Sequence, residues 1–144
     1  MENSITTLML QEHGKIKNFL QDFEKSIKNN TNNCEKNFNK FKWNLEKHFF
    51  IEEKVIFTIF NSANEEESED ILNLLKEHKK ILFLIESIEE NSFKNAEQKV
   101  SELSQILTNH ANFENEIFYP KLDDELNENQ KCLIIERCNE IILQ

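Results

Sequence analysis

Residues 48–60 read HFFIEEKVIFTIF, and a related stretch, HANFENEIFYP, occupies residues 110–120. Each stretch begins with His-x-x-x-Glu and continues into apolar residues; the pairs are His48 with Glu52 and His110 with Glu114. Side chains at positions i and i+4 of an α-helix lie one above the other, so each pair presents an imidazole and a carboxylate to one point. This arrangement is typical of metal chelation.

The other two histidines belong to a second repeat. Residues 12–16 read EHGKI and residues 77–81 read EHKKI, which place His13 and His78 in matching positions. The chain therefore consists of two halves, each with a lone histidine followed by a His-x-x-x-Glu pair. Such short motifs also arise by chance, so their meaning depends on where the fold places them.

The composition predicts an all-α fold. Among 144 residues there are one glycine and one proline, which leaves few strong turn signals. Lysine, glutamate, leucine and isoleucine are abundant and favour long helices. The length suits one ordinary domain, and we expect a single domain over residues 1–144.

Apolar residues at steps of three and four mark the helices. We expect helices at about 4–27 and 35–60, a third capped by Ser62 or Asn64 with acidic residues 65–67 in its first turn, and a fourth that ends at Pro120. A shorter segment at 129–143 should pack outside the others. The pattern predicts an up-down-up-down four-helix bundle with a short additional C-terminal helix.

The apolar stripes also predict which side chains face the core near the histidines. On the second helix the stripe includes Glu52, Val55 and Ile59, and on the fourth it includes Glu114 and Ile117. Both carboxylates therefore fall among core positions. The prediction of each stripe assumes regular α-helical spacing along the whole helix.

The turns predict that the four histidines share one level of the bundle. The midpoint between His13 and His48 falls in the polar run 29–33, and that between His48 and His78 falls at residue 63. The midpoint between His78 and His110 falls at residue 94, just after the expected turn at 91–92. In antiparallel neighbours this spacing brings all four imidazoles to the same height.

A core layer of four imidazoles and two carboxylates predicts a dinuclear metal site. A buried unpaired carboxylate is costly, and bound cations would remove that cost. The donor set exceeds the four ligands of structural zinc and suits two iron ions, with manganese as a possible substitute. We predict six metal ligands: His13, His48, Glu52, His78, His110 and Glu114. The alternative is a set of core histidines that bind no metal.

Residues beside the motifs are predicted to have structural roles. Four glutamates lie off the apolar stripes and should face solvent: Glu12, Glu53, Glu77 and Glu116. Tyr119 should lie at a helix interface, with contact to the metal ligands as the alternative. Five phenylalanines should pack in the core or between helices, and some could line a dry pocket over the metals: Phe49, Phe50, Phe57, Phe113 and Phe118.

Charge and cysteine usage narrow the class of protein. The formal net charge of −10 argues against nucleic acid and anionic membrane surfaces, because both require a basic patch. No apolar run has membrane-spanning length, and MENSITTLML lacks the features of a secretion signal. Three cysteines without a C-x-x-C pair suit a reducing compartment. We expect a cytoplasmic protein.

The histidine motifs resemble those of the hemerythrin-like, HHE cation-binding family. The resemblance extends from His13 to Tyr119 and rests on His13, His48-x-x-x-Glu52, His78 and His110-x-x-x-Glu114. It implies a four-helix bundle with a non-haem di-iron centre, whose irons are bridged by the two carboxylates and by an oxo or hydroxo group. It also implies a diatomic gas, O2 or NO, as the exogenous ligand.

Two positions differ from the oxygen-carrying hemerythrins. Those proteins have a further histidine where this chain has Leu74, and an aspartate where it has Asn115. The set of four histidines and two glutamates is more similar to the di-iron domain of iron-sulfur cluster repair proteins. It is also similar to the iron-sensing hemerythrin-like domain of a ubiquitin-ligase subunit. The resemblance therefore does not imply simple oxygen carriage.

Three functions are compatible with these residues. The first is a binding module that binds or senses O2, or senses iron. The second is redox chemistry on NO or peroxide, or iron donation in the repair of iron-sulfur clusters; the third is an iron store or a metal-free helical protein. The first two need the same ligands and differ in pocket access and redox potential. Whether the protein is an enzyme stays open at this point.

Overall fold

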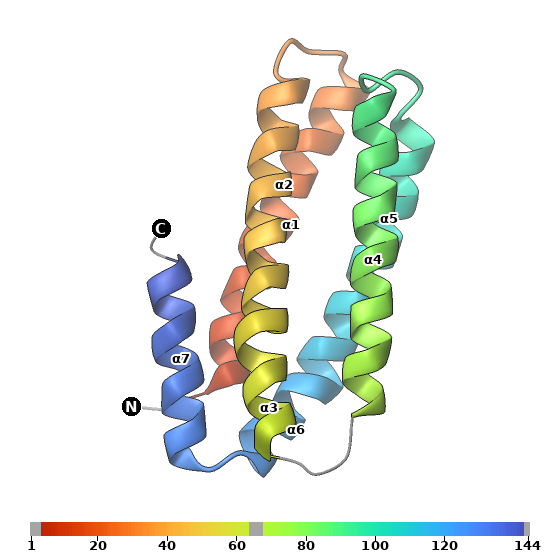
Figure 1. Cartoon of the computed structure of the whole chain (residues 1–144). Helices are drawn as coiled ribbons and strands as arrows, with labels where there is room; N and C mark the ends of the chain where they lie inside the picture. Colours follow the sequence, from red (N-terminus) through yellow and green to blue (C-terminus); the bar gives the residue numbers. More distant parts are fainter. Residues whose placement is uncertain (1–3, 64–67, 143–144) are drawn as a thin grey trace.

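The computed structural model describes residues 4–63 and 68–142 (Figure 1). In chain order the helices are α1 (Ile5–Lys28), α2 (Cys34–Ile51), α3 (Phe57–Ala63), α4 (Glu69–Glu90), α5 (Glu97–Phe113), α6 (Tyr119–Glu125) and α7 (Glu128–Ile142). Two π-helical turns, η1 (Glu52–Ile56) and η2 (Glu114–Phe118), join α2 to α3 and α5 to α6. The described residues contain no β-strand, and none of their helices is long and apolar enough to cross a membrane.

Four long helical segments lie side by side and confirm the predicted all-α bundle. Figure 1 shows that α1, α2 with α3, α4, and α5 with α6 run alternately up and down. The turns from α1 to α2 and from α4 to α5 meet at the same end. The short helix α7 packs outside the bundle against α1 and α2, as the sequence predicts.

The third long helix begins later than predicted. Ser62 lies inside α3, and the N-cap of α4 is Ser68, whose hydroxyl accepts a hydrogen bond from the backbone N–H of Ile71. Ser68 is followed by Glu69 and Asp70 in the first turn of α4. Acidic residues in a first turn were also the reason for predicting a cap at Ser62 or Asn64. The other predicted cap, Asn64, and the acidic residues 65–67 lie outside the described residues.

The two π-helical turns change which side chains are buried after the ligand motifs. A π-helical turn contains one more residue than expected, so every later side chain rotates around the helix axis. On η1 and α3, Phe60 is buried and the predicted core residue Ile59 is half-buried. On η2, Phe118 is fully buried and the predicted core residue Ile117 is 53% exposed. The regular spacing assumed from the sequence was correct for Val55, which is buried, but was wrong for Ile59 and Ile117.

Pro120 does not end the last long segment, contrary to the prediction. It lies in the first turn of α6, directly after η2. The first residues of a helical segment need no backbone N–H donor, so a proline is tolerated there. The segment therefore continues through Glu125.

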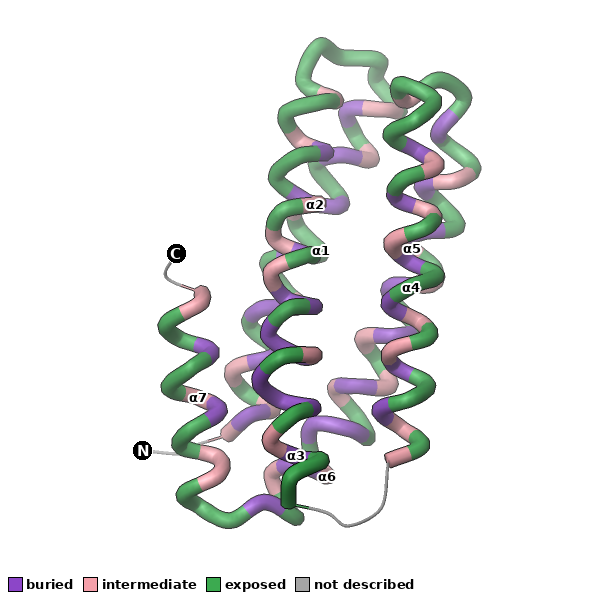
Figure 2. Tube along the Cα trace, in the orientation of Figure 1, coloured by how far each residue is buried: buried purple, intermediate pink, exposed green. Residues whose placement is uncertain are grey.

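Figure 2 marks the buried residues along the chain trace. They form two hydrophobic clusters, one toward each end of the bundle. The cluster near the start of α1 includes Ile5, Met9, Ile56, Phe60, Leu74, Phe118 and Cys138. The cluster near the α1–α2 turn includes Leu20, Phe23, Phe38, Phe41, Leu45, Ile85 and Leu103. Both clusters are dominated by fully buried Phe, Ile and Leu side chains. The predicted ligands lie between them.

Candidate metal centre

All six predicted ligands meet in one layer of the bundle, which we call the His/Glu layer: His13, His48, Glu52, His78, His110 and Glu114. Two overlapping groups of potential ligand atoms lie there, each with its atoms within 4.8 Å of one another. The first contains Glu52, His78, His110 and Glu114, and the second contains His13, His48 and Glu114. Glu114 belongs to both groups.

The imidazoles form two pairs. The Nε2 atoms of His13 and His48 lie 3.1 Å apart, and the ring centroids of His78 and His110 lie 5.0 Å apart. His48, His78 and His110 are buried, whereas the side chain of His13 is 11% exposed. The pair formed by His13 and His48 is therefore the one closer to solvent.

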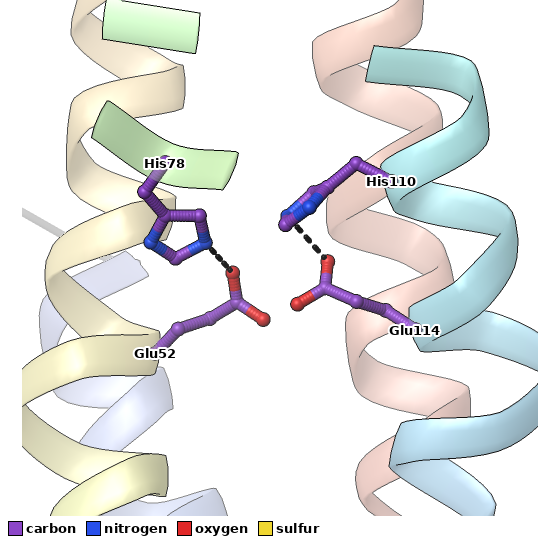
Figure 3. Close-up of side chains that lie close together, drawn as sticks. All are labelled: Glu52, His78, His110 and Glu114. Carbon is purple, nitrogen blue, oxygen red and sulfur yellow. Dashed lines mark ion pairs between the residues drawn. The ribbon is translucent and has the colours of Figure 1, made fainter. Parts of the chain in front are cut away.

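Each carboxylate spans the two imidazole pairs. Oε1 of Glu52 lies 3.4 Å from Nε2 of His48 and 3.1 Å from Nε2 of His78. Oε1 of Glu114 lies 3.2 Å from Nε2 of His13 and 3.2 Å from Nε2 of His110. Figure 3 shows Glu52 and Glu114 pointing toward each other from opposite sides of the bundle. Each carboxylate therefore lies within reach of one imidazole of each pair.

The donor atoms of the layer fit bound cations. Although they lie close together, several of these buried atoms make no hydrogen bond: Oε1 of Glu52, both carboxylate oxygens of Glu114, and Nε2 of His78 and His110. Leaving such atoms buried without a partner costs a great deal of free energy. They all face the same space, where a cation would satisfy them together.

Three side chains outside the layer contact three of the imidazoles at the ring nitrogen that faces away from the layer. The Nδ1 atom of each ring lies within hydrogen-bond distance of an acceptor: His78 with Glu53 at 2.8 Å, His110 with Glu77 at 2.6 Å and His13 with Asn115 at 2.8 Å. In a neutral ring whose Nδ1–H donates outward, Nε2 carries no proton and can bind a cation. Such outer partners typically orient metal-binding histidines.

These contacts correct the prediction that the neighbouring glutamates face solvent. Glu53 and Glu77 bind histidines of adjacent helices, and Glu12 is buried, whereas Glu116 is exposed as predicted. The prediction failed because it judged each residue by the stripe of its own helix. The acidic residue beside the histidine in both repeats, Glu12-His13 and Glu77-His78, is the sequence signal that could have found Glu12 and Glu77.

Glu77 is expected to control the affinity of the site for metal. Replacing it with leucine leaves Nδ1 of His110 without its acceptor, so the ring loses its orientation and basicity. We expect the Glu77→Leu variant to bind iron about 10- to 100-fold more weakly, as measured by competition with a chelator. The exposed Glu86 on the same helix provides the control, and Glu86→Leu should bind iron like the native chain.

Tyr119 is part of the site and does not lie only at a helix interface. Its buried hydroxyl donates a hydrogen bond of 2.8 Å to Oε2 of Glu52 and lies 3.2 Å from Nε2 of His13. Burial and the charges of Glu114 and Glu52 raise the pKa of Tyr119 well above its usual value, so it stays a phenol and a donor. The hydroxyl holds one oxygen of Glu52.

Aromatic rings cover the more buried imidazole pair. Phe49 stacks on His78 with ring centroids 3.8 Å apart, and Phe57 lies on the same ring at 6.0 Å. Phe118 is buried in the core, whereas Phe50 is 52% exposed and was wrongly predicted to pack inside. The stacked rings keep water from this side of His78.

The charges of the layer make the stability of the metal-free protein depend on pH. Burial disfavours the charged form of His110, but Glu114, Glu52 and Glu77 outweigh it and raise the pKa of His110 to about 9 from 6.5. The stabilising protonation is complete below pH 6.5 and is lost as pH rises to about 9. The pKa of His48 is raised in the same direction, chiefly by Glu52, against the effect of burial.

We therefore expect the metal-free protein to become less stable as pH rises through this window. The loss should be on the order of 3 kcal/mol of unfolding free energy. Thermal unfolding monitored by circular dichroism, with and without metal, measures it. The metal-loaded protein should lack this trend because its imidazoles are held neutral as ligands; the same slope in both forms would contradict the placement of His110 beside the carboxylates.

Comparison with known proteins agrees with this geometry. The family model of the hemerythrin HHE cation binding domain matches residues 4–122, which include the whole His/Glu layer. No curated protein and no solved structure matches the chain. The match and the buried cluster of histidines and glutamates together account for a cation site in a helical bundle. By this match over most of its length, the chain belongs to the hemerythrin HHE cation-binding domain family.

Proposed function

We propose that this chain is a non-haem di-iron protein that binds or senses O2, or senses iron. The observation that carries the proposal is that both carboxylates reach across the two imidazole pairs. One ion would be held by His13 and His48 and the other by His78 and His110, with Glu52 and Glu114 shared. Six nitrogen and oxygen donors around two ions suit iron better than the four-ligand sites of zinc.

When bound, a di-iron centre would supply electrons and open positions for a diatomic gas. The protein's own residues determine which molecules reach the centre and how the metal-binding side chains are oriented. Glu53, Glu77 and Asn115 orient three rings, and Phe49 excludes water beside His78. His13 lies on the partly exposed side, so an external molecule meets this side of the layer first.

One observation favours the second function, redox chemistry on NO or peroxide. The reduction of such molecules builds negative charge on oxygen, and the hydroxyl of Tyr119 is a buried hydrogen-bond donor beside Glu52 and His13. A pure O2-binding protein does not require a donor at this position. Iron donation in the repair of iron-sulfur clusters stays an alternative that the same ligands permit.

The two functions are separated by exposing the reduced, iron-loaded protein first to O2 and then to NO. Leu74 is fully buried one helical turn before His78, where oxygen-carrying hemerythrins have a further histidine. We expect reduced native protein to oxidise rapidly in air, because one ion has a protein ligand fewer. The Leu74→His variant should oxidise several-fold more slowly, as followed by visible absorption.

The opposite pattern would restore the oxygen-carrier function. In that case the native protein would bind O2 reversibly, with a spectrum that returns on removal of the gas, and Leu74→His would leave the oxidation rate unchanged. Spectral changes with NO but none reversible with O2 would favour the redox function. An iron content of zero, in protein produced with ample iron, would contradict both functions.

A further inference from the structure

A cavity opens beside the His/Glu layer between α1, α2 and α5. Its volume is about 420 Å3, and three of the four imidazoles line one part of it: His13, His48 and His110. Cavities of roughly 300–1,000 Å3 typically hold organic ligands, and a diatomic gas would fill only a small part. The residues of α1 that line it extend from Leu10 to Glu24, roughly 21 Å along the helix. The cavity is therefore long enough for a linear molecule.

The walls of this cavity carry both apolar and polar side chains, and its charged residues are unevenly placed. The buried apolar side chains that line it are Ile16, Leu20, Leu45, Phe49 and Leu107. Among the lining residues, Lys17 lies one helical turn from His13, whereas Glu24 lies two turns further along α1. A negatively charged head group is thus favoured near Lys17 and the imidazoles, and disfavoured near Glu24.

Gly14 leaves the wall of the cavity open beside the imidazoles. A glycine inside a helix costs about 1 kcal/mol relative to alanine. Close packing does not require a glycine here, since a Cβ atom at residue 14 would meet no described atom within 4 Å. Gly14 lines the cavity one residue after His13, so a large side chain there would enter the opening.

We propose that this cavity binds a linear amphipathic carboxylate of medium chain length. Its head lies toward Lys17 and the imidazoles, and its chain lies along Leu20, Leu45 and Leu107. The proposal deepens the proposed function, because it names an organic ligand for the same site. Binding in the cavity, however, needs any cation in the layer and does not need iron or O2.

The test uses zinc-loaded protein, which is diamagnetic, with octanoate as the probe and acetate as its short control. Each buried methylene group multiplies affinity about fourfold, so octanoate should bind at least tenfold more tightly than acetate in calorimetry. Octanoate should shift the NMR signals of Leu45 and Leu107. Gly14→Phe and Lys17→Glu should each weaken octanoate binding at least fivefold, whereas Gly14→Ala should leave it unchanged.

Several results would overturn the proposal. These are equal affinities for octanoate and acetate, NMR shifts at the exposed Trp43 or Phe83 instead of the cavity, or normal octanoate binding by Gly14→Phe. If azide or NO binds to the iron-loaded protein while octanoate does not bind, the cavity is only an entry path and the proposed function survives. If octanoate binds while the iron-loaded protein ignores O2 and NO, the proposed function fails and the cavity proposal survives.

A second inference comes from the pattern of outer partners behind the imidazoles. Each His-x-x-x-Glu segment supplies a partner five residues after its own histidine: Glu53 for His78 and Asn115 for His13. Helix α4 carries the lone histidine His78. The residue just before it, Glu77, is the outer partner of His110. By the internal repeat, the matching residue of α1 is Glu12, and the imidazole that it would serve is His48.

Glu12 and His48 each have a buried side-chain atom without a hydrogen bond. Oε1 of Glu12 and Nδ1 of His48 are buried and make no hydrogen bond. The other oxygen of Glu12 lies 3.5 Å from Nζ of Lys15, whose side chain is 55% exposed. An exposed ion pair of this kind does not explain why Glu12 is buried.

We infer that Glu12 accepts a hydrogen bond from Nδ1–H of His48 when metal is bound, and so completes a ring of four outer partners. Glu12 is then a positioning residue for His48, because it holds the ring with Nε2 toward the layer. The bond needs a neutral imidazole that carries its proton on Nδ1, which is the form that a metal-bound Nε2 imposes.

The test compares three variants of zinc-loaded protein. Glu12→Leu should lose the slowly exchanging Nδ1–H proton signal of His48 in NMR and bind zinc about 10- to 100-fold more weakly. Glu12→Gln should keep the signal, since its amide oxygen also accepts. Lys15→Met removes the other partner of Glu12 and should change neither measurement. If Glu12→Leu lowers only the stability of the protein, with the proton signal and zinc affinity intact, Glu12 is structural and the inference is wrong.

Discussion

Chelating the metal from the loaded protein is expected to lower the midpoint of thermal unfolding by roughly 10–30 °C. An ion held at a thousand times its dissociation constant contributes about 4 kcal/mol to stability, and the layer contains two overlapping groups of potential ligand atoms. Removal also leaves the carboxylates of Glu52 and Glu114 buried and facing each other without a cation. Calorimetry before and after chelation, followed by addition of iron, measures the change.

The helices should survive chelation even though the midpoint falls. The hydrophobic clusters on either side of the layer do not contain the ligands, and residues such as Phe23, Phe38 and Leu103 are fully buried without them. Far-ultraviolet circular dichroism at low temperature should therefore change little. Equal unfolding midpoints for the chelated and loaded forms would mean that the carboxylates do not face a cation.

Replacing Glu114 with alanine should remove both ions, not one. Glu114 is the residue common to both groups of ligand atoms, and its Oε1 lies 3.2 Å from an imidazole of each pair. The loss of iron affinity should exceed the 10- to 100-fold typical of an outer partner. Elemental analysis of protein produced with ample iron measures the content, with Glu116→Ala as the control in the same π-helical turn, since Glu116 is exposed.

The same substitution should also destabilise the metal-free protein below about pH 9. Oε1 of Glu114 lies 3.2 Å from Nε2 of His110, and its charge helps to raise the pKa of His110 to about 9, so Glu114→Ala removes the partner of a buried protonated imidazole. We expect the metal-free variant to unfold at a lower temperature than the metal-free native chain, and the loaded native chain to exceed both. A Glu114→Ala variant that retains two ions per chain would show that Glu114 is not shared between them.

Several features of the site follow from local sequence patterns. Regular spacing places His48 above Glu52 and His110 above Glu114 on single helices, and the distances between turns bring the four histidines to one level. These predictions depend only on helix geometry and on where a helix ends. The all-α bundle and the outside position of α7 were predictable for the same reason.

Other features depend on which helices become neighbours, and a local pattern holds no such information. Glu53 and Glu77 look like surface residues on their own helices, yet each binds a histidine of the next one. Tyr119 likewise reaches Glu52 from a segment 67 residues away. Their roles exist only after the bundle has assembled.

The two π-helical turns decide which side chains are buried after each glutamate ligand, and local sequence patterns do not predict them. A regular helix would have buried Ile117, but η2 begins at Glu114 and buries Phe118 in its place. Nothing in the spacing of apolar residues indicates the extra residue, because the wider turn depends on packing against the other helices. The sequence by itself determined the helices and the set of six converging side chains. Only the tertiary structure decided the rotation of each helix after its glutamate, the outer partners of the histidines and the cavity beside them, because each of these depends on contacts between segments far apart in the chain.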